Sequence, residues 1–517
     1  MQKTRRLVII SYLLFYYRID LLILPKYLRI SHLMFWSRSV KEIPRGKRLY
    51  LLCCSLGPFF IKLGQLVSIR HDLFPSDVTQ SLTKLQDCVP PEPFSYIEDA
   101  ISTELNRPIH SIFRHIDKKP LGSASIAQVH GGILNNGEHV AIKILRPNIQ
   151  KKIKLDMAIL NTLCRLVMNH KLAHKLIKEY QYTFEQELNL QQEGSHYSQI
   201  KHHFKQDTRL YVPKVYWELT SQNMLTTERI NAVNIRDIHQ YTDVAYEKLA
   251  HHGLEIFFTQ VFEHRFFHAD MHPGNVLIDI TNPKFPKYIA IDFGIIGIIS
   301  EQDQYYLIES FLAIYHRDYA RIAKLHIEAD WVDSTTDPLK FENALRGVCE
   351  PIFSLPIAKV SIANIMQQIM HASKSFKLKM QPQLLMLQKT LFHVEALGRQ
   401  LYPELNVLTA SKPYIESVIK KRTSACYSWQ HLQAELPRII QKSPLLPTLM
   451  IDHLTKPNQK TSVPKQDHST ILYILIISTL INAPLKLTKP GLIYIITNII
   501  IITVAWKKLR PKDSVSY

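Results

Sequence analysis

Three stretches of the sequence combine residue types and spacings that suit phosphate chemistry. In the first, the apolar run Val140–Ile142, which is typical of a strand, leads directly into Lys143. A lysine on an apolar strand is costly to bury unless its ammonium meets a charged partner. Taken alone, Lys143 is better explained as a strand-edge side chain whose stem packs while its charge stays in water. Its interpretation therefore depends on the other two stretches.

The second stretch is the loop Phe266–Asn275, in which Asp270 and Asn275 are five residues apart. This spacing would let the Asp270 carboxylate orient a hydroxyl group while the Asn275 amide oxygen coordinates a metal ion. The third stretch is the apolar run Tyr288–Ile291, which ends in Asp292-Phe293-Gly294. Asp292 suits a Mg²⁺ ion that bridges nucleotide phosphates, because Mg²⁺ is hard and prefers a few carboxylate oxygens.

The order of the three stretches is more informative than any one of them. A lysine strand, an Asp-x4-Asn loop and an Asp-Phe-Gly strand end, in this order, match the signature set of protein kinases. Chance assembly of all three is improbable, so the sequence favours an architecture for phosphoryl transfer. The residues predicted to converge on one magnesium-bound nucleotide are Lys143, the catalytic Asp270, and the metal ligands Asn275 and Asp292.

Lys143 needs an anionic partner, which we expect from the helix that follows its strand. Glu193 is the preferred candidate, within the segment Glu187–Glu193. Glu185 and Glu187 are the alternatives, and all of these glutamates could instead face solvent on the surface of a helix.

A glycine-rich loop of the G-x-G-x-x-G type does not precede the lysine strand, and the stretch PLGSASIAQV takes its place. Small side chains still allow close approach of the backbone, but alanine and serine lack the freedom of glycine to adopt positive φ. We therefore expect a stiff phosphate loop. The stretch in this position runs from Pro120 to Val129. No Ala-Pro-Glu element follows Asp292, which leaves no room for a peptide-docking activation segment.

A small β-rich lobe followed by a larger helical lobe would bring these stretches together. Asn136-Gly137 between two apolar runs is a strong hairpin signal, and the chain from Val244 onward is mostly helical in pattern. We predict an α+β, two-lobed, kinase-like fold with a helical N-terminal extension and a C-terminal hydrophobic, transmembrane helical hairpin. The predicted boundaries are 1–105 for the extension, 106–230 for the N-lobe, 231–454 for the helical C-lobe, 455–469 for a linker and 470–506 for the hairpin.

The C-terminal segment is the part of the chain that most resembles a membrane anchor. From Thr470 to Trp506 the only charged residues are Lys486 and Lys489, beside a proline-containing break. Each apolar half has about 16 residues, whereas a spanning helix wants about 20, so each half would need a thinned bilayer or help from its flanks. A hairpin buried in a protein core is the alternative. The basic residues that follow place the tail and the main body in the cytoplasm by the positive-inside rule.

The N-terminus resembles a signal peptide only in part. Lys3, Arg5 and Arg6 precede an apolar run, but Arg18 and Asp20 follow without a small-residue cleavage site. We predict an uncleaved amphipathic helix whose basic and aromatic side chains rest on anionic lipid. The alternative is a helix that simply packs on the domain.

The composition narrows the classes of protein further. The 517 residues are 46% hydrophobic and 21% charged, so a large core can form and wholesale disorder is excluded. The net charge of +19 suggests anionic lipid, nucleic acid or phosphorylated ligands, but it is scattered without a nucleic-acid-binding module, which disfavours nucleic acid. The six cysteines form no C-x-x-C pair, and no H-E-x-x-H motif occurs, so we expect His268 and His272 to shape the catalytic loop rather than to bind zinc.

Several longer motifs occur in a consistent order along the chain. They are Lys62-Leu63-Gly64-Gln65, followed by LQDCVPP, then PLGSASIAQVH, VAIKILRP, FFHADMHPGN and IDFGIIG. With these motifs the chain resembles the UbiB/ADCK family of atypical kinases, most closely its bacterial members, over nearly its whole length. The resemblance implies an atypical protein-kinase-like fold with ATP and Mg²⁺ as cofactors. It also implies that ATP is contacted by Lys143 and by the loop residues Leu121, Gly122, Ser123, Ala124, Ser125, Ile126, Ala127, Gln128 and Val129.

The resemblance also gives the Lys-x-Gly-Gln segment a role. On spacing alone, Lys62 and Gln65 would be a polar stripe on a helix. The family implies that they fold over the nucleotide cleft and block protein substrates. The chain departs from the family pattern at Gly122, where alanine is usual, and at Asn189, where the Glu-x-Asp motif often has aspartate.

The function implied by the resemblance is support of aerobic ubiquinone biosynthesis at the cell inner membrane, with the catalytic body on the cytoplasmic side. The implied partners are membrane lipids, namely quinone precursors, and other ubiquinone-biosynthesis proteins. Two alternatives remain open: a small-molecule phosphotransferase, and a non-catalytic nucleotide-binding scaffold for lipid intermediates. A homodimer also remains open, because two short hydrophobic helices could pair between protomers.

Overall fold

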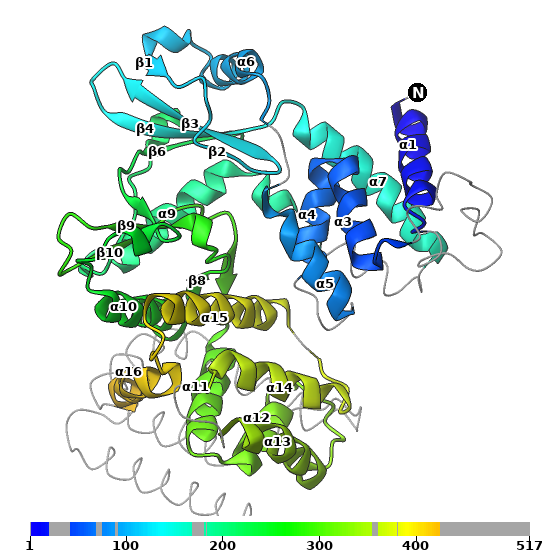
Figure 1. Ribbon diagram of the computed structural model, residues 1–517, viewed down its shortest axis with the longest axis vertical. Coiled ribbons are helices and arrows are strands. Elements are labelled where there is room, and N and C mark those ends of the chain that lie inside the picture. Colours follow the sequence, from blue (N-terminus) through cyan, green and yellow to red (C-terminus); the bar gives the residue numbers. More distant parts are fainter. Residues whose placement is uncertain are drawn as a thin grey trace, which may run out of the picture. The chain divides into compact units, whose positions relative to one another are not determined.

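A computed structural model describes residues 2–19, 42–68, 75–87, 91–167, 180–181, 184–353, 360–379 and 381–423. They all belong to one compact unit, Met1–Ser424. The unit combines many helices with three small sheets (Figure 1), so the predicted mixture of helix and sheet is confirmed. The predicted linker 455–469 and hydrophobic hairpin 470–506 lie outside the described residues.

The N-terminal region is helical. Its helices are α1 (Gln2–Tyr16), α3 (Arg45–Leu56), α4 (Pro58–Ser68) and α5 (Ser76–Leu82). Helix α4 buries Phe59, Phe60 and Ile61, because it is enclosed by α3, α5 and the later helix α7 (Ile149–Val167). Arg6 of α1 forms an ion pair with Asp156 of α7, with Nε 2.7 Å from the carboxylate, and this pair attaches the first helix to the rest.

The small lobe is built on an antiparallel sheet in the order β1-β3-β4-β6, with β2 on β3. Its strands are β1 (Phe113–Ile116), β2 (Gly122–Ser123), β3 (Ala127–Leu134), β4 (His139–Leu145) and β6 (Met224–Glu228). The hairpin expected at Asn136-Gly137 joins β3 to β4, and Gly137 adopts φ 89°, which glycine tolerates without a steric cost.

The side chains on the two faces of β4 contact different parts of the molecule. Val140 and Ile142 are fully buried under α6 (Phe94–Leu105), in a cluster with Ile97 and Ile101. Because side chains alternate along a strand, Lys143 points to the opposite face. Helix α6 therefore packs on the sheet of the small lobe, although the predicted boundary at residue 105 placed it in the N-terminal extension.

The larger lobe carries two further sheets, one in the order β5-β10-β9-β7 and one that pairs β11 with β8. The strands are β5 (Leu210–Tyr211), β7 (Val233–Asn234), β8 (Phe266–His268), β9 (Val276–Asp279), β10 (Lys287–Ala290) and β11 (Ile296–Ile298). The loop with Asp270 connects β8 to β9, and Asp292 follows the end of β10. Short antiparallel pairs thus bring both acidic residues to one side of the lobe.

Helices make up the remainder of the larger lobe. They are α9 (Leu190–His203), α10 (Tyr246–Phe258), α11 (Glu301–Tyr315), α12 (Tyr319–Glu328), α13 (Pro338–Phe353), α14 (Ile362–Lys374), α15 (Pro382–Leu401) and α16 (Val407–Thr423). Helix α15 packs along α10 and α14 (Figure 1). Leu384, Leu387 and Leu391 of α15 are buried at helical spacing, so one face of this helix is fixed in the core.

Helix α1 has one packed face and one exposed face. Ile10 is buried, whereas Leu7, Val8, Ile9 and Tyr12 are exposed. This two-faced pattern is the one expected of an amphipathic surface helix, although the helix also packs on the domain. Within the part of the chain that the structure describes, no helix is long and apolar enough to cross a membrane.

Candidate active site

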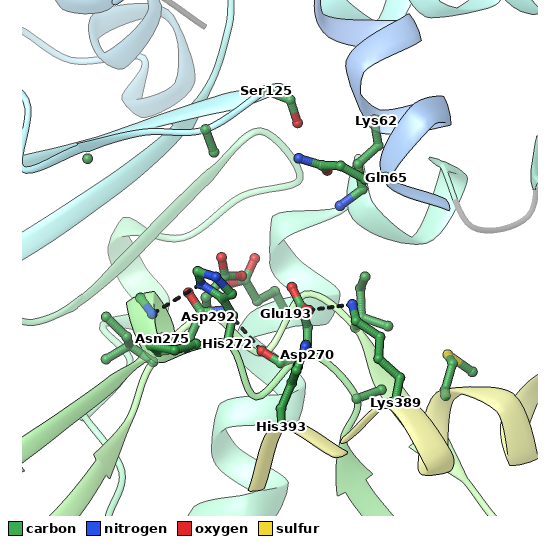
Figure 2. A pocket seen from close by; sticks show the side chains of 18 of the residues that line it. Lys62, Gln65, Ser125, Glu193, Asp270, His272, Asn275, Asp292, Lys389 and His393 are labelled. Carbon is green, nitrogen blue, oxygen red and sulfur yellow. Dashed lines mark hydrogen bonds and ion pairs between the residues drawn. The ribbon is translucent and has the colours of Figure 1, made fainter. Parts of the chain in front are cut away.

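A cavity of about 1820 Å³ lies between the small sheet and the larger lobe. Its lining comes from α4, from the β2–β3 and β4 strands, from α9, from the β8–β9 loop and from α14 and α15 (Figure 2). The residues predicted to converge, namely Lys143, Asp270, Asn275 and Asp292, all line it, as do Glu193, Lys62 and Gln65. Segments far apart in the sequence therefore meet around one space.

Lys143 is held by two carboxylates. Its Nζ lies 2.9 Å from both carboxylate oxygens of Glu193 and 2.8 Å from Oδ1 of Asp292. The expected ion pair with Glu193 is thus present. Burial opposes the charged ammonium, but Asp292 and Glu193 outweigh it and raise the pKa of Lys143 above its usual range. Burial raises the pKa of Glu193 to about 7, more than Lys143 lowers it.

Asp292 adopts a backbone conformation that is unusual for a residue other than glycine. Its φ is 64°, in the left-handed region that aspartate tolerates better than most side chains. Its backbone N–H donates to the Tyr197 hydroxyl oxygen at 2.8 Å, which links the turn to α9. Burial by itself raises the pKa of Asp292, but the nearby Lys143 ammonium lowers it by a larger amount. The pKa of Asp292 is therefore below its usual value, and the carboxylate is ionised.

The loop around Asp270 is fixed by histidines and an asparagine. The backbone N–H of Asp270 donates to His268 Nδ1 at 3.1 Å, and the N–H of Gly274 donates to His272 Nδ1 at 3.1 Å. The side-chain amide of Asn275 donates to the Asp270 carbonyl at 3.2 Å. The two histidines therefore shape the loop, as expected.

A π-helical turn, Thr259–Glu263, is hydrogen-bonded to the strand residue that precedes this loop. Gln260 in the turn accepts a hydrogen bond from the backbone N–H of His268 at 2.9 Å. Burial lowers the pKa of the His268 imidazole, so this ring is neutral and its Nδ1 can act as an acceptor. Such π turns are often found at functional sites.

The donor set of the cavity fits Mg²⁺. Asp292 offers carboxylate oxygens and Asn275 an amide oxygen, which are the hard ligands this ion prefers. Among the described residues, no cluster of three or more histidine, cysteine or acidic side chains is arranged to hold a metal by itself. A magnesium ion bound together with nucleotide phosphates needs only one or two carboxylates from the protein.

The Lys-x-Gly-Gln segment lies on α4 at the edge of the cavity (Figure 2). Lys62 forms an ion pair with Glu187 at 2.7 Å, and the Gln65 side chain donates to the Leu85 carbonyl at 3.0 Å. A Cβ on Gly64 would come within 2.3 Å of the Leu85 side chain, so glycine allows α4 to pack closely here. Glu187, considered above for Lys143, is therefore the partner of Lys62 instead.

The predicted phosphate loop enters the cavity only in part. Its lining residues are Leu121, Gly122, Ser123, Ala124, Ser125, Ala127 and Val129. The side chains of Ile126 and Gln128 are buried outside the lining. Gln128 accepts a hydrogen bond from the Glu92 backbone at 2.6 Å. The structure thus corrects the prediction for these two side chains. Gln128 faces the opposite side of β3 from Ala127 and Val129, and Ile126, in the bend before β3, packs in the hydrophobic core.

The two departures from the family pattern have simple structural settings. Asn189 caps α9, and its side-chain oxygen accepts from the Gln192 backbone N–H at 3.2 Å. An aspartate could cap the helix in the same way. Gly122 has open space where a Cβ would lie, and its φ is outside the left-handed region.

Lys389 on α15 is a site residue that the sequence reasoning missed. Its Nζ lies 2.9 Å from Oδ1 of Asp270 (Figure 2). Burial raises the pKa of Asp270, but Lys389 and then Lys62 outweigh this effect and hold it well below its usual range. The only sequence signal was a lysine on the polar side of an otherwise apolar helix, which usually means a solvated face.

The arrangement combines cations that can bind phosphates with carboxylates that can hold a metal ion. Lys143 and Lys389 face the cavity next to Asp292 and Asp270. Such a set of charges can neutralise a polyphosphate and orient a hydroxyl group towards it.

Comparison with known proteins shows which family the chain is similar to. Residues 84–326 match the family model of the ABC1 atypical kinase-like domain, and residues 345–406 match that of the UbiB helical domain. A Marinobacter nauticus protein named "Probable protein kinase UbiB" is 39% identical over 485 residues, which are 91% of this chain and 89% of that protein. A protein of the same name from Cellvibrio japonicus is 40% identical over 471 residues, or 88% of this chain and 85% of its own.

Solved structures show a more distant similarity. A Mycobacterium tuberculosis protein, solved in complex with erythromycin, has 19% identity and a TM-score of 0.48, covering 68% of this chain and 90% of that one.

Proposed function

The chain belongs to the UbiB family of atypical kinase-like proteins, and from this premise we propose that it is an ATP-dependent kinase or ATPase that supports aerobic ubiquinone biosynthesis at the cell inner membrane. The observation that carries the proposal is the meeting of Lys143, Asp270, Asn275 and Asp292 around one cavity. Fold alone would not imply an activity, but these side chains are the ones that phosphoryl transfer needs.

Each residue has a chemical task in this proposal. Lys143 would bind the inner phosphates of ATP, and Glu193 keeps its ammonium in place through two contacts of 2.9 Å. Asn275 and Asp292 would hold Mg²⁺, which when bound neutralises phosphate charge. Asp292 is at present bound to Lys143 and would exchange that contact for the metal ion.

Asp270 would orient the acceptor hydroxyl. In the transfer, the bond from the terminal phosphorus to the ADP oxygen breaks, a bond to the acceptor oxygen forms, and the acceptor proton passes to the Asp270 carboxylate. Because the pKa of Asp270 is low, it is a weak base, and its main contribution is to hold the hydroxyl in line. With water as the acceptor, the same residues would hydrolyse ATP.

The position of α4 favours a small or lipid acceptor over a protein. Lys62 and Gln65 line the cavity, and their helix is fixed by the Glu187 ion pair and by the Leu85 hydrogen bond. We propose that quinone precursors in the membrane are the relevant partners, together with other ubiquinone-biosynthesis proteins. The exposed apolar face of α1, with Val8 and Tyr12, supports a location at the membrane surface.

The test combines nucleotide binding with function in cells. Binding of Mg–ATP is measured by calorimetry for the wild type, Lys143→Ala and Asp270→Asn, and each variant is expressed in bacteria that lack their own gene of this family. We expect Lys143→Ala to lose binding and ubiquinone synthesis, and Asp270→Asn to keep binding but lose synthesis.

Other outcomes separate the alternatives. Normal ubiquinone synthesis with Asp270→Asn, which still binds ATP, would indicate a non-catalytic scaffold. Normal synthesis with both variants would contradict the proposal altogether.

A further inference from the structure

The ammonium of Lys389 lies next to Asp270, at the place where phosphoryl transfer would occur. Its Nζ is 2.9 Å from Asp270 Oδ1, and both side chains line the cavity with about a quarter of their surface exposed, 26% and 29%. Lys389 belongs to the region 345–406 that matches the UbiB helical domain, outside the match to the kinase-like domain. A separate region of the chain thus reaches the catalytic loop.

The loop from Asp270 to Asn275 contains no lysine or arginine of its own. The basic residue in this loop is His272, whose Nδ1 is hydrogen-bonded by the Gly274 backbone N–H at 3.1 Å and lies 3.3 Å from the Arg236 guanidinium. A terminal phosphate next to Asp270 would bring two negative groups together. Such a contact is strongly unfavourable unless a cation lies between or beside them.

Among the described residues, three other lysines line the cavity: Lys374 lies on α14, and Lys143 and Lys62 pair with other carboxylates. Lys143 forms ion pairs with Glu193 and Asp292, and Lys62 forms one with Glu187. The ammonium of Lys389, in contrast, forms its ion pair with Asp270 itself. A nucleotide with its inner phosphates at Lys143 would extend its outer phosphate towards Asp270 and hence towards Lys389.

The packing of helix α15 fixes the backbone at Lys389, so that its side chain starts at a defined distance from Asp270. Leu387 and Leu391 on the same helix are buried, and the Thr390 hydroxyl donates to the Met386 carbonyl at 2.8 Å. One turn further along, His393 also lines the cavity. Burial, with Lys389 nearby, lowers the pKa of His393 to about 4, so this ring is neutral and does not share the task.

We propose that Lys389 of α15 forms a binding subsite for the terminal phosphate of a nucleoside triphosphate. The helical region 345–406 thereby completes the active site. In this role the ammonium turns from Asp270 to the phosphate oxygens, where it offsets charge as the phosphoryl group leaves. This inference rests on the proposed nucleotide chemistry and adds a residue to it.

The decisive experiment compares two ligands that differ by one phosphate. Dissociation constants are measured by calorimetry for Mg–ADP and for Mg–AMP-PNP, a non-hydrolysable triphosphate, with the full chain in detergent. We expect Lys389→Ala to bind the triphosphate roughly tenfold or more weakly and ADP within about twofold of the wild type. Lys389→Arg should restore most of the preference, because a guanidinium also binds phosphate.

Two controls isolate the position of the charge. Lys374→Ala removes a lysine that lines the same cavity from α14 and should affect ADP and the triphosphate alike. Lys389→Met in an Asp270→Asn background keeps the alkyl stem and leaves no unpaired carboxylate, so it separates folding from binding. Compared with Asp270→Asn alone, this double variant should again lose the triphosphate selectively.

The possible outcomes of these binding measurements have different consequences for the phosphate subsite and for the proposed function. Equal loss for both ligands, or none, would overturn the phosphate subsite. A gain of triphosphate affinity would overturn it as well, since Lys389 would then act as a block on Asp270. Failure of the wild type to bind either nucleotide is a different result, which would overturn the proposed function itself.

Discussion

Lys62 of α4 and Glu187 in the helical turn before α9 form an ion pair at 2.7 Å, with only 15% and 6% of their side chains exposed. Glu193, six residues further on, pairs with Lys143. Each of the two glutamates therefore pairs with a different lysine: Glu187 with one from the N-terminal helices, and Glu193 with one from the small sheet. This shared segment connects the Lys-x-Gly-Gln helix to the nucleotide lysine.

The Lys62–Glu187 pair should show strong energetic coupling. Lys62→Met or Glu187→Gln alone leaves one buried charge without its partner, and each should lower the free energy of unfolding by roughly 3–5 kcal/mol. The double variant should cost much less than the sum of the two. Denaturant unfolding of all four proteins measures this coupling.

An exposed ion pair in the same helical region provides the control. Arg45 and Asp77 are 2.6 Å apart but about half exposed, and the matched variants Arg45→Met and Asp77→Asn should be nearly additive. Additive effects at Lys62 and Glu187 as well would contradict a tight buried pair.

Glu193→Gln should separate stability from nucleotide binding. The amide is isosteric and Lys143 keeps its ion pair with Asp292 at 2.8 Å, so the variant should lose much less stability than Glu187→Gln does. It should nevertheless bind Mg–ATP about tenfold more weakly, because the Lys143 ammonium is less firmly held. Glu185→Gln, at an exposed position nearby, is the matched control and should bind normally.

The same variant gives a pH dependence with a defined sign. The pKa of Glu193 is raised to about 7 when folded, against about 4.3 in an unfolded chain. Between these values the folded state binds more protons, so wild-type stability should rise relative to Glu193→Gln as the pH falls from 8 to 5. The slope should approach about 1 kcal/mol per pH unit. An unchanged difference across this range would show that Glu193 is ionised throughout.

Much of the site followed from local sequence because its parts have local causes. A lysine on an apolar strand, a polar loop that leads into a strand, and an aspartate at a strand end place Lys143, Asp270 and Asp292 by simple geometry. Glu193 lies on α9 and not on α7, the helix that directly follows the strand of Lys143, so the expected partner is right although its helix is not the next one along the chain. Strand alternation also accounts for Gln128 of β3, whose side chain points away from the cavity.

Lys389 could not be predicted from the sequence in the same way. It contacts a residue 119 positions away, and that contact depends on how α15 packs against α10 and α14. Periodicity identifies the buried leucines of α15, but not which of its polar residues meets Asp270. The Lys62–Glu187 pair could not be predicted for a similar reason. The sequence does not show whether Glu187 meets Lys62 or Lys143, because that depends on how α4 packs.

The phosphate loop should tolerate an alanine at Gly122. An added Cβ would meet no atom within 4 Å, and the backbone does not need positive φ. Gly122→Ala should therefore raise the free energy of unfolding by about 0.4–1 kcal/mol, because alanine restricts the unfolded chain. Gly137→Ala, in the same sheet but at φ 89°, should lower it by roughly 1–2 kcal/mol. Thermal or denaturant unfolding tests both, and a loss of stability at Gly122 would show that the loop needs glycine.

The exposed face of α1 should lie at the level of the lipid headgroups. Tyr12 is 51% exposed beside Val8 and Ile9, and Lys3 and Arg5 precede it on the same short helix. A Tyr12→Trp variant in vesicles with anionic, brominated lipids should gain a quenched fluorescence component relative to the wild type. Tyr96→Trp, at a residue of α6 that is 57% exposed, should gain an unquenched one. Equal quenching at both positions, or at neither, would mean that α1 does not contact the bilayer selectively.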